Sequence, residues 1–438
     1  MKIDNYIESV YKNNPLWFVE EVEKPIHIKR ISKMYDLKSY LCGQHRVLSR
    51  EDMKFKDKEF KVKKLILQNA KTILNFHSTY LLGTPVSLVG TENMIKKMED
   101  VYRFGNYNDT DFRLLDKMIK FGDSFEYIYK DGDRIKSKVI ASEDSYPVFA
   151  DDGEYIAFIE SWTNIDNISY WNVYYEDRVE EYTNEGGYIH LLGAYKNISG
   201  LPVHYHMISD EDDRFGEGLL ENIIPILDEI EDLLSKMGDS IYTLSLNPLL
   251  LTVGQAIEGT ISNDAVGYNI ALENGSDMKY VNAEMDYNTI KYYLDTLQNN
   301  LNMCAYMPSI VGGNSNIANV SEVSLKLLYQ LADVYAMLSE KAMRNGINER
   351  FNIIRKLLGL ENDKDYINVV FNYSRPQNAS ELLDNLKKQF EMSAISIQTI
   401  IEKSPLTTDV NMELERIDKG NKNSEPVNEI GKVDKKEL

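Results

Sequence analysis

The sequence predicts an α+β protein in which a β-rich region lies between helices. Short segments that alternate apolar and polar residues, separated by turn signals, run from residue 124 to residue 195 and predict antiparallel strands. Apolar residues spaced by four and three predict two long helices, with seams that run from Leu220 to Leu244 and from Ile290 to Cys304. A third long helical pattern runs from Ser321 to Leu358. Strands gathered in one part of a chain and helices in others are typical of the α+β class.

Composition narrows the classes of function. The 438 residues carry a net charge of −20, which argues against a protein that grips nucleic acid by neutralising phosphates. An acidic wall would instead repel passing DNA and prevent it from sticking. The two cysteines, Cys42 and Cys304, argue against a disulfide framework and fit a reducing cytoplasm. No apolar run reaches the ~18 residues of a membrane span and the N-terminus lacks the apolar core of a signal peptide, so we expect no membrane partner.

The N-terminal part predicts helices around a basic segment. A short helix is expected at Pro15–Glu23, where the proline suits the first helical position. The lysine-rich segment 52–64 is interpreted as a solvated face that leads into the next helix, and contact with an anionic partner is the open alternative. That next helix is expected over Leu65–Leu82, ending at a glycine and a proline, with a strand following at Val86–Val89. A further helix is expected over Thr110–Phe121.

Period-two alternation predicts a series of strands after that helix. Ser124–Tyr129 and Arg134–Ile140 flank an Asp-Gly-Asp turn and form the first expected hairpin. The other strands are expected at Tyr146–Phe149, Tyr155–Trp162, Ser169–Tyr175, Val179–Tyr182 and Ile189–Tyr195.

Each of the two long helices carries a continuous apolar seam. The seam residues are Leu220, Ile223, Leu227, Ile230, Leu234, Met237, Ile241 and Leu244 in the first helix, and Ile290, Leu294, Leu297, Leu301 and Cys304 in the second. Acidic residues crowd the rest of the first helix: Asp228, Glu229, Glu231 and Asp232. Such a pair commonly braces the core of an ordinary helical domain, and the alternative is a stalk that packs against copies of itself. The pattern alone does not decide between the two.

A compact excursion separates these helices, and a loop follows them. Strands are expected at Leu249–Val253 and Met278–Val281, on either side of a connection rich in Gly and Asn. After the second helix, Tyr306–Pro308 interrupts the pattern and a loop of small residues follows at 309–319. Loops of this length without their own structure are usually functional or mobile.

The C-terminal part predicts more helices. Ser321 is a good N-cap for the third long helix, in which we expect a bend at Asn345–Gly346. A strand is expected at Ile367–Asn372, and helices over 379–392, 395–402 and 409–417. From Lys419 onward the polar composition predicts disorder.

Catalytic motifs are absent from the sequence, which contains no phosphate-binding loop, no nucleophile elbow and no Cys pair with zinc spacing. His204 and His206 would share one face of a strand, with the acidic run Asp210–Asp213 nearby. A metal-dependent hydrolase or nuclease using these residues is therefore the alternative hypothesis. The favoured interpretation places both histidines on the surface and lets the acidic run complement the dipole of the following helix. We expect no cofactor and no enzymatic activity.

Five segments, taken in order, resemble the portal proteins of tailed bacteriophages, in particular those of siphophages of Gram-positive hosts. The segments are Asn69–Val86 (NAKTILNFHSTYLLGTPV), Gly122–Tyr129 with Glu143–Phe149, Gly218–Gly254, Pro308–Lys326 (PSIVGGNSNIANVSEVSLK) and Ser393–Arg416. The sequence departs from that family's pattern at Glu322–Val323, where a glycine and a small residue are expected. The resemblance covers roughly residues 60 to 420, and the order of the motifs makes it more specific than any one of them.

The resemblance implies a ring, usually of twelve copies, at one vertex of an icosahedral head, through which double-stranded DNA is packaged and ejected. It implies as partners the terminase large subunit, the head-tail adaptor, and the major capsid and scaffolding proteins. It places the protein in the virion, after assembly in the cytoplasm of a bacterial host. A third interpretation is a monomeric interaction scaffold whose long helices are buried in its own core.

The resemblance also divides the chain into a portal fold. The expected parts are an N-terminal region and wing (1–219), stem helices (220–247 and 285–304), a clip (248–284), a channel loop (305–319), a long wing helix and strand (320–374), a helical crown (375–418) and a disordered tail (419–438). Channel-loop residues expected near DNA are Pro308, Ile310, Gly312, Gly313, Asn314, Ser315 and Asn316. Residues expected to pack the stem are Ile223, Leu227, Ile230, Leu234, Met237, Ile241, Leu294, Leu297 and Leu301.

Overall fold

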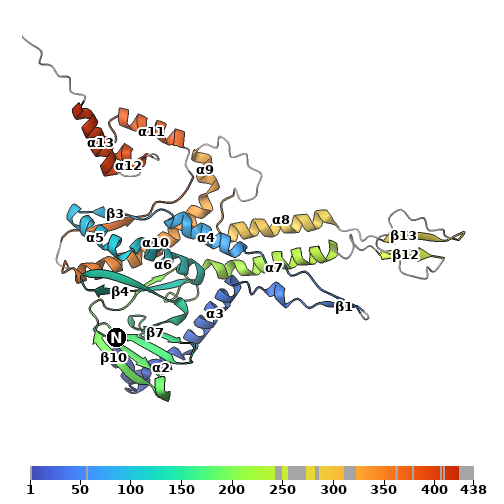
Figure 1. Cartoon of the computed structure of the whole chain (residues 1–438), viewed down its shortest axis with the longest axis horizontal. Helices are drawn as coiled ribbons and strands as arrows, with labels where there is room; N and C mark the ends of the chain where they lie inside the picture. Colours follow the sequence, from blue (N-terminus) through green and yellow to red (C-terminus); the bar gives the residue numbers. More distant parts are fainter. Residues whose placement is uncertain are drawn as a thin grey trace, which may run out of the picture. The chain divides into compact units, whose positions relative to one another are not determined.

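The computed structural model divides the chain into two compact units. It describes residues 2–55, 58–241, 249–254, 273–281, 286–309, 322–360, 364–376, 379–404, 407 and 410–423. The larger unit comprises Met1–Gly312 and Gln330–Ser374, and the smaller comprises Gly313–Tyr329 and Arg375–Leu438. Helices and strands of the larger unit occur in separate runs along the chain, which is typical of the α+β class (Figure 1).

A five-stranded antiparallel sheet fills one end of the larger unit, in the order β10-β9-β8-β7-β6. Its strands are β6 (Ser145–Phe149), β7 (Tyr155–Thr163), β8 (Ser169–Tyr174), β9 (Arg178–Thr183) and β10 (His190–Lys196). The five strands predicted from alternation are thereby confirmed to within a residue or two at each end. Trp17 and Phe18 of a short helix pack on this sheet and are almost fully buried.

Three helices precede that sheet in the chain: α1 (Ile3–Tyr11), α2 (Trp17–Val22) and α3 (Pro25–Leu41). Only α2 was predicted, and Pro15 precedes its N-cap, Leu16, where the sequence placed it at the first helical position. Pro25 holds that first position instead, in α3. The period of α3 is hard to recognise because His27 and Arg30, both polar, occupy its inner face.

A second sheet has the order β11-β4-β5, from β4 (Asp123–Asp131), β5 (Arg134–Ile140) and β11 (Val203–His206). The predicted hairpin of β4 and β5 is confirmed, with Asp131 paired to Arg134 across the turn. Helices α5 (Glu92–Gly105), α6 (Tyr107–Phe121) and α10 (Gln330–Leu357) contact this sheet. Helix α5 was missed, although Met94, Met98 and Tyr102 bury one of its faces at four-residue spacing.

A fully buried ionic cluster joins this sheet to the helices. Arg350 on α10 pairs with Glu126 on β4, at 2.8 Å from Nε to Oε2, and with Asp111 on α6. The hydroxyl of Tyr205 on β11 donates to Glu126 at 2.6 Å, and Arg350 donates to the hydroxyl of Tyr102 at 3.1 Å. Burial raises the pKa of Asp111 in spite of the neighbouring guanidinium. The cluster, centred on Arg350, therefore joins five separate elements: α10, β4, α6, β11 and α5.

Two long helices, α7 (Leu219–Ser240) and α8 (Tyr287–Cys304), run side by side and antiparallel (Figure 1). The chain between them contains β12 (Leu249–Val253) and β13 (Asp277–Val281), close to the predicted strand positions, and the two strands pair antiparallel. The connection between these strands, and the predicted last turns of the first helix, lie outside the described residues. Helix α4 (Asn69–Leu82) packs against α7, α6 and α10 and ends at Gly83 as predicted, but it begins four residues later than predicted.

The third long helix differs from its prediction. The structure has α9 (Glu322–Leu328) and α10 as two helices, separated at Tyr329, and α10 continues through Asn345 and Gly346 without a break. Gly346 serves close packing instead of a bend, because an added Cβ would lie 2.2 Å from the ring of Tyr205. The predicted N-cap, Ser321, lies outside the described residues.

The remaining elements agree with the predicted order, except that strands β1 and β2 were not predicted. In the larger unit, β3 (Ser87–Gly90) pairs with β14 (Ile367–Val370), and β1 (Met53–Phe55) pairs with β2 (Lys58–Phe60). The smaller unit contains α9, α11 (Ala379–Glu391), α12 (Ile397–Lys403) and α13 (Val410–Asn423). Residues 419–423, predicted to be disordered, belong to α13, and the rest of the predicted tail lies outside the described residues. Within the described part of the chain, no helix combines the length and apolar character needed to cross a membrane.

Candidate functional site

The apolar seam of α7 changes character along the helix. Ile223, Leu227 and Ile230 are at most 2% exposed, within the core of their own chain. Further along, Leu234 and Met237 are only partly buried and Ile241, just past the end of the helix, is 43% exposed. The first half of the seam thus holds the subunit together, and the second half leaves apolar surface open.

Helix α8 is more open than α7. Of its predicted seam residues, Leu301 is 5% exposed, whereas Leu294 and Leu297 are partly buried. Tyr292, which the seam did not include, is 76% exposed, and Tyr293 donates from its hydroxyl to Glu229 of α7 at 3.2 Å. Most of the surface of α8 is therefore uncovered in a single chain.

A segment made of a short 3₁₀ helix, η1 (Arg46–Ser49), and a stretch without regular structure lies along the acidic face of α7, and sequence reasoning missed it. We name residues 45–52 and 61–67, on either side of β1 and β2, the strap. Three backbone N–H groups of the strap donate to α7 side chains four residues apart: Leu67 to Glu231 at 2.7 Å, Leu65 to Ser235 at 3.0 Å, and Lys63 to Asp239 at 2.7 Å. Part of the basic segment interpreted as a solvated face is thus bound to the acidic face of a helix.

Side chains of the strap complete this contact. His45 and Glu231 are 4% and 1% exposed, and His45 Nδ1 lies 2.8 Å from Glu231 Oε1, so the imidazole donates to the carboxylate. Arg50 pairs with Asp239 at 2.9 Å and with Asp232 at 3.5 Å. The acidic residues that crowd α7 are therefore largely paired within the subunit. The opposite charges of the strap and α7 were the one feature of the sequence that could have predicted this contact.

The end of α8 is a tight turn that starts the predicted channel loop. The N–H of Tyr306 donates to the carbonyl of Met303 at 3.2 Å, and that of Met307 donates to the carbonyl of Asn302 at 2.8 Å. This is the Schellman arrangement, in which the residue after the cap is usually Gly or Asn. Tyr306 occupies that position with φ of 52°, in the left-handed region. The predicted helix break at Tyr306–Pro308 is confirmed.

His77 on α4 holds this turn from below. Its Nε2 lies 2.7 Å from the carbonyl oxygen of Ala305, and because a carbonyl can only accept, Nε2 carries the proton. The histidine is 3% exposed and Ala305 is fully buried. Burial lowers the pKa of His77 to about 4, so the imidazole is neutral near pH 7. No sequence pattern could indicate this contact, because every residue type has a backbone carbonyl that can accept a hydrogen bond.

The predicted channel-loop residues can be placed only at their start. Pro308 is buried at the base of the loop. Ile310, Gly312, Gly313, Asn314, Ser315 and Asn316 lie outside the described residues.

The histidines of the alternative metal site have other partners. His204 is not a surface residue as predicted: it is partly buried, stacks on Phe125 with ring centroids 4.5 Å apart, and pairs with Asp123 at 2.8 Å. His206 contacts the carbonyl of the next residue, and burial lowers its pKa. In the described part of the chain, no three His, Cys, Asp or Glu side chains gather as metal ligands would. The acidic run does not cap α7 either, since its N-cap is Gly218.

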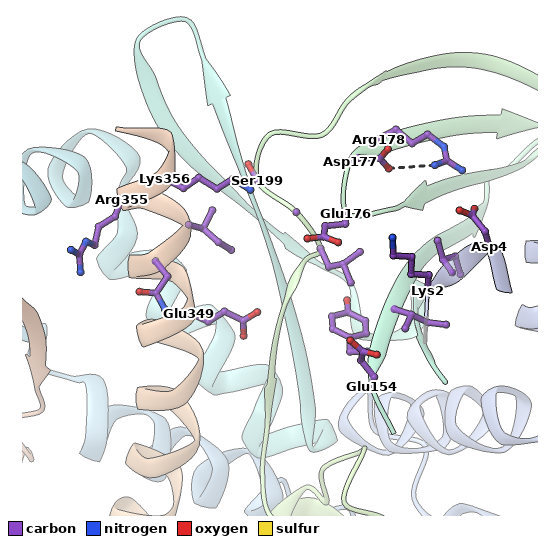
Figure 2. A pocket seen from close by; sticks show the side chains of 17 residues that line it. Lys2, Asp4, Glu154, Glu176, Asp177, Arg178, Ser199, Glu349, Arg355 and Lys356 are labelled. Carbon is purple, nitrogen blue, oxygen red and sulfur yellow. Dashed lines mark hydrogen bonds and ion pairs between the residues drawn. The ribbon is translucent and has the colours of Figure 1, made fainter. Parts of the chain in front are cut away.

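A cleft of about 1250 Å³ opens between the last turns of α10, the β8–β9 turn and the start of α1. Figure 2 shows Glu349 and Lys356 on the α10 side, facing Glu176 and Arg178 across the cleft. Arg178 is paired with Asp177 at 3.3 Å. Acidic and basic side chains alternate around the opening, so the cleft has no single sign of charge with which to select a ligand.

Comparison with known proteins adds a family match. The family model described as "Phage portal protein, SPP1 Gp6-like" matches residues 20–426. No curated protein sequence matches the chain.

Among solved structures, chains from gene transfer agent (GTA) particles align with this chain. A chain in the neck of an empty GTA particle computed with C6 symmetry aligns with a TM-score of 0.49 at 12% identity, over 76% of this chain and 89% of that chain. A chain in the virion of a native GTA particle aligns with a TM-score of 0.47 at 12% identity, over 75% and 87%. A chain in the neck of a native GTA particle computed with C12 symmetry gives 0.47 at 13% identity, over 76% and 89%.

Proposed function

The chain belongs to the phage portal protein family, SPP1 Gp6-like, and from this premise we propose that its ring of twelve copies is the conduit through which double-stranded DNA is packaged and ejected. Membership makes it a structural protein of the virion that forms a homo-oligomeric ring at the portal vertex, with the α+β portal fold. The proposal extends that statement to the number of copies, the passage of DNA and the partners at the vertex.

The observation that carries the proposal is the order α7, β12, β13, α8. A pair of long antiparallel helices with a small two-stranded sheet inserted between them supports the assignment of a stem and a clip, which the portal resemblance implied. We propose 220–247 and 285–304 as stem, 248–284 as clip, 305–319 as channel loop, and 375–418 as crown. An isolated two-stranded sheet is marginally stable, which supports a clip completed by neighbouring copies.

We further propose the partners of the ring. The terminase large subunit and then the head-tail adaptor dock at the clip, and the wing meets the major capsid and scaffolding proteins during assembly in the host cytoplasm. The chain has no catalytic activity of its own in this proposal. The pairing of His204 with Asp123 supports this, because it engages one of the two histidines on which the enzyme hypothesis depended.

Burial within a single chain reduces the set of seam residues that could contact a neighbouring copy. Ile223, Leu227, Ile230 and Leu301 are buried within one chain, so they cannot also be covered by a neighbour. Leu234, Met237, Ile241, Leu294 and Leu297 are partly buried or exposed and are proposed to meet the neighbouring copy, together with the exposed Tyr292. For the channel loop, Ile310 and the segment 312–316 remain the proposed residues near DNA, whereas Pro308 is buried within its own chain and is proposed only to set the base of the loop.

The native mass of the purified particle tests the proposal. Native mass spectrometry combined with negative-stain images is expected to give a closed ring of twelve times 50.5 kDa with a central hole. A dimer or another small closed oligomer would contradict it. DNA packaging into proheads that contain the purified ring tests the conduit itself.

A further inference from the structure

The start of the channel loop is tied to α4 in a place closed to water. Ala305 is 0% exposed and His77 is 3% exposed, so the carbonyl of Ala305 has no access to solvent. If the imidazole did not donate to it, the carbonyl would be left buried without a partner, which is costly. The left-handed Tyr306 follows directly, so the direction in which the chain leaves α8 depends on this fixed point.

The start of α10, which follows the loop and α9 in the chain, is tied to the same helix. Tyr80 of α4, 2% exposed, donates from its hydroxyl to Oδ1 of Asp333 in the first turn of α10, at 2.5 Å. Tyr335, also in the first part of α10, contacts both His77 and the turn that ends α8. Its ring lies 4.6 Å from the His77 ring in a T-shaped contact and 5.2 Å from the Tyr306 ring.

We propose that α4 anchors the start of the channel loop, with His77 as its positioning residue, and that Tyr80 fixes the first turn of α10, where the chain returns to the larger unit after α9. The inference rests on the proposed function, since it names what holds the loop that DNA passes. His77 and Tyr80 are three residues apart and therefore lie on the same face of the helix. The ring of Tyr335 closes the gap between them.

This anchor explains a motif that the portal resemblance left without a role. The segment Asn69–Val86 resembles a family motif, yet it belongs to neither the stem nor the loop. Helix α4 packs against α6, α7 and α10. A force that DNA exerts on the loop would thus be transmitted to α4 and from there to the stem and the body of the subunit.

Two substitutions at one position separate anchoring from general packing. His77→Phe keeps a ring against Tyr335 but removes the donor to Ala305. His77→Gln offers an amide donor at similar reach. Thr79→Val is the matched control, because its exposed hydroxyl bonds only to carbonyls of its own helix. The rings formed by the full-length chains are first compared by native mass, and then by the rate of thermolysin cleavage between residues 309 and 329, with the cut sites identified by mass spectrometry.

Cleavage of the His77→Phe ring is expected to be about tenfold faster than that of the unmodified ring, because the chain end opens more often. His77→Gln should restore a rate within about twofold of the unmodified ring, and Thr79→Val should leave it unchanged. Equal rates for His77→Phe and the unmodified ring, or no rescue by His77→Gln, would overturn the proposal.

A measurement on the unmodified ring covers the case in which His77→Phe fails to assemble. Hydrogen exchange is expected to show the amides of Tyr306 and Met307 protected as strongly as the last turn of α8. Rapid exchange at both amides in an intact ring would refute the anchor. Absence of any ring would instead count against the proposed function, so the two failures are distinguishable.

Discussion

Arg350 donates from Nε to Oε2 of Glu126 at 2.8 Å, and both side chains are fully buried although 224 residues separate them in the chain. One guanidinium thus joins α10 to β4, and through Asp111 to α6. This relationship makes the late helix and the early sheet parts of one core. It also sets a clear expectation for stability.

Removal of the guanidinium should be severely destabilising. Arg350→Met is expected to lower the free energy of unfolding by about 3–5 kcal/mol, because two carboxylates would remain buried without a cation. Guanidinium chloride unfolding of the purified subunit measures this. Arg103→Met is the control, since its pair with Asp100 is exposed, and it should change stability by less than about 1 kcal/mol. Similar losses for both variants would show that the buried cluster does not stabilise the core.

The strap should detach when its buried acceptor is removed. Glu231→Ala deprives the imidazole of His45 and the N–H of Leu67 of their shared acceptor, and we expect a loss of about 2–3 kcal/mol together with faster proteolysis of residues 45–67. Glu229→Ala, on the same helix but exposed, should cost less than about 1 kcal/mol. Unchanged proteolysis of the strap in Glu231→Ala would rule out this contact as the one that holds it.

Stability should fall in weak acid through His77. Its pKa is lowered from 6.5 to about 4 in the folded state, so the folded protein binds fewer protons than the unfolded chain between these values. The contribution is fully present above pH 6.5 and is lost as the pH falls toward 4, by about 3 kcal/mol in total. His77→Gln should remove that part of the slope. Urea unfolding between pH 7 and pH 4.5 measures the difference, and parallel curves for the two proteins would contradict the assignment.

Two leucines on one helix should give different defects. Leu227→Asp places a charge in the core, where Leu227 is 2% exposed, and should unfold the subunit. Leu234→Asp, at a partly buried position, should leave folded subunits that do not form rings. Circular dichroism reports the folding and native mass spectrometry the assembly. If Leu234→Asp forms normal rings, the proposed stem contact between copies is wrong.

Deletion of Gly312–Asn316 should separate assembly from passage of DNA. Rings are expected to form normally, because the stem and wing are unchanged, and DNA packaging should be impaired. The two readouts are the mass of the assembled ring, from native mass spectrometry, and the amount of DNA retained per prohead. Normal packaging with the deletion would count against a role for the channel loop.

Local patterns predicted the elements better than their partners. The strands from β4 to β10 were found because side chains alternate between two faces and turn residues separate them. Helix α3 was missed because polar residues, His27 and Arg30, lie on its inner face, where apolar ones are expected. Gly346 was interpreted as a bend because the sequence does not reveal that the ring of Tyr205 fills the space of its missing side chain.

The candidate site was predictable in outline only. Apolar spacing identified the paired helices, but it could not say which part of the seam faces the subunit's own core, because a buried leucine and an interface leucine have the same spacing. The acidic face of α7 was visible in the sequence, whereas its partner was not. Contacts such as Leu67 with Glu231 use a backbone N–H, which every non-proline residue offers alike.

The three hydrogen bonds between the strap and α7 join two structures with slightly different repeat lengths. Side chains four residues apart on a helix are spaced about 6.0 Å along its axis, and alternate N–H groups of an extended chain are spaced about 6.6 Å. The two spacings differ by ~0.6 Å per step, so donors and acceptors face each other over about three hydrogen bonds before they fall out of register. A slip of the strap by one residue would turn every donor to the other side of its chain. The strap can therefore bind α7 only in discrete axial positions, and a shift of α7 along its axis relative to the strap must break the three hydrogen bonds together.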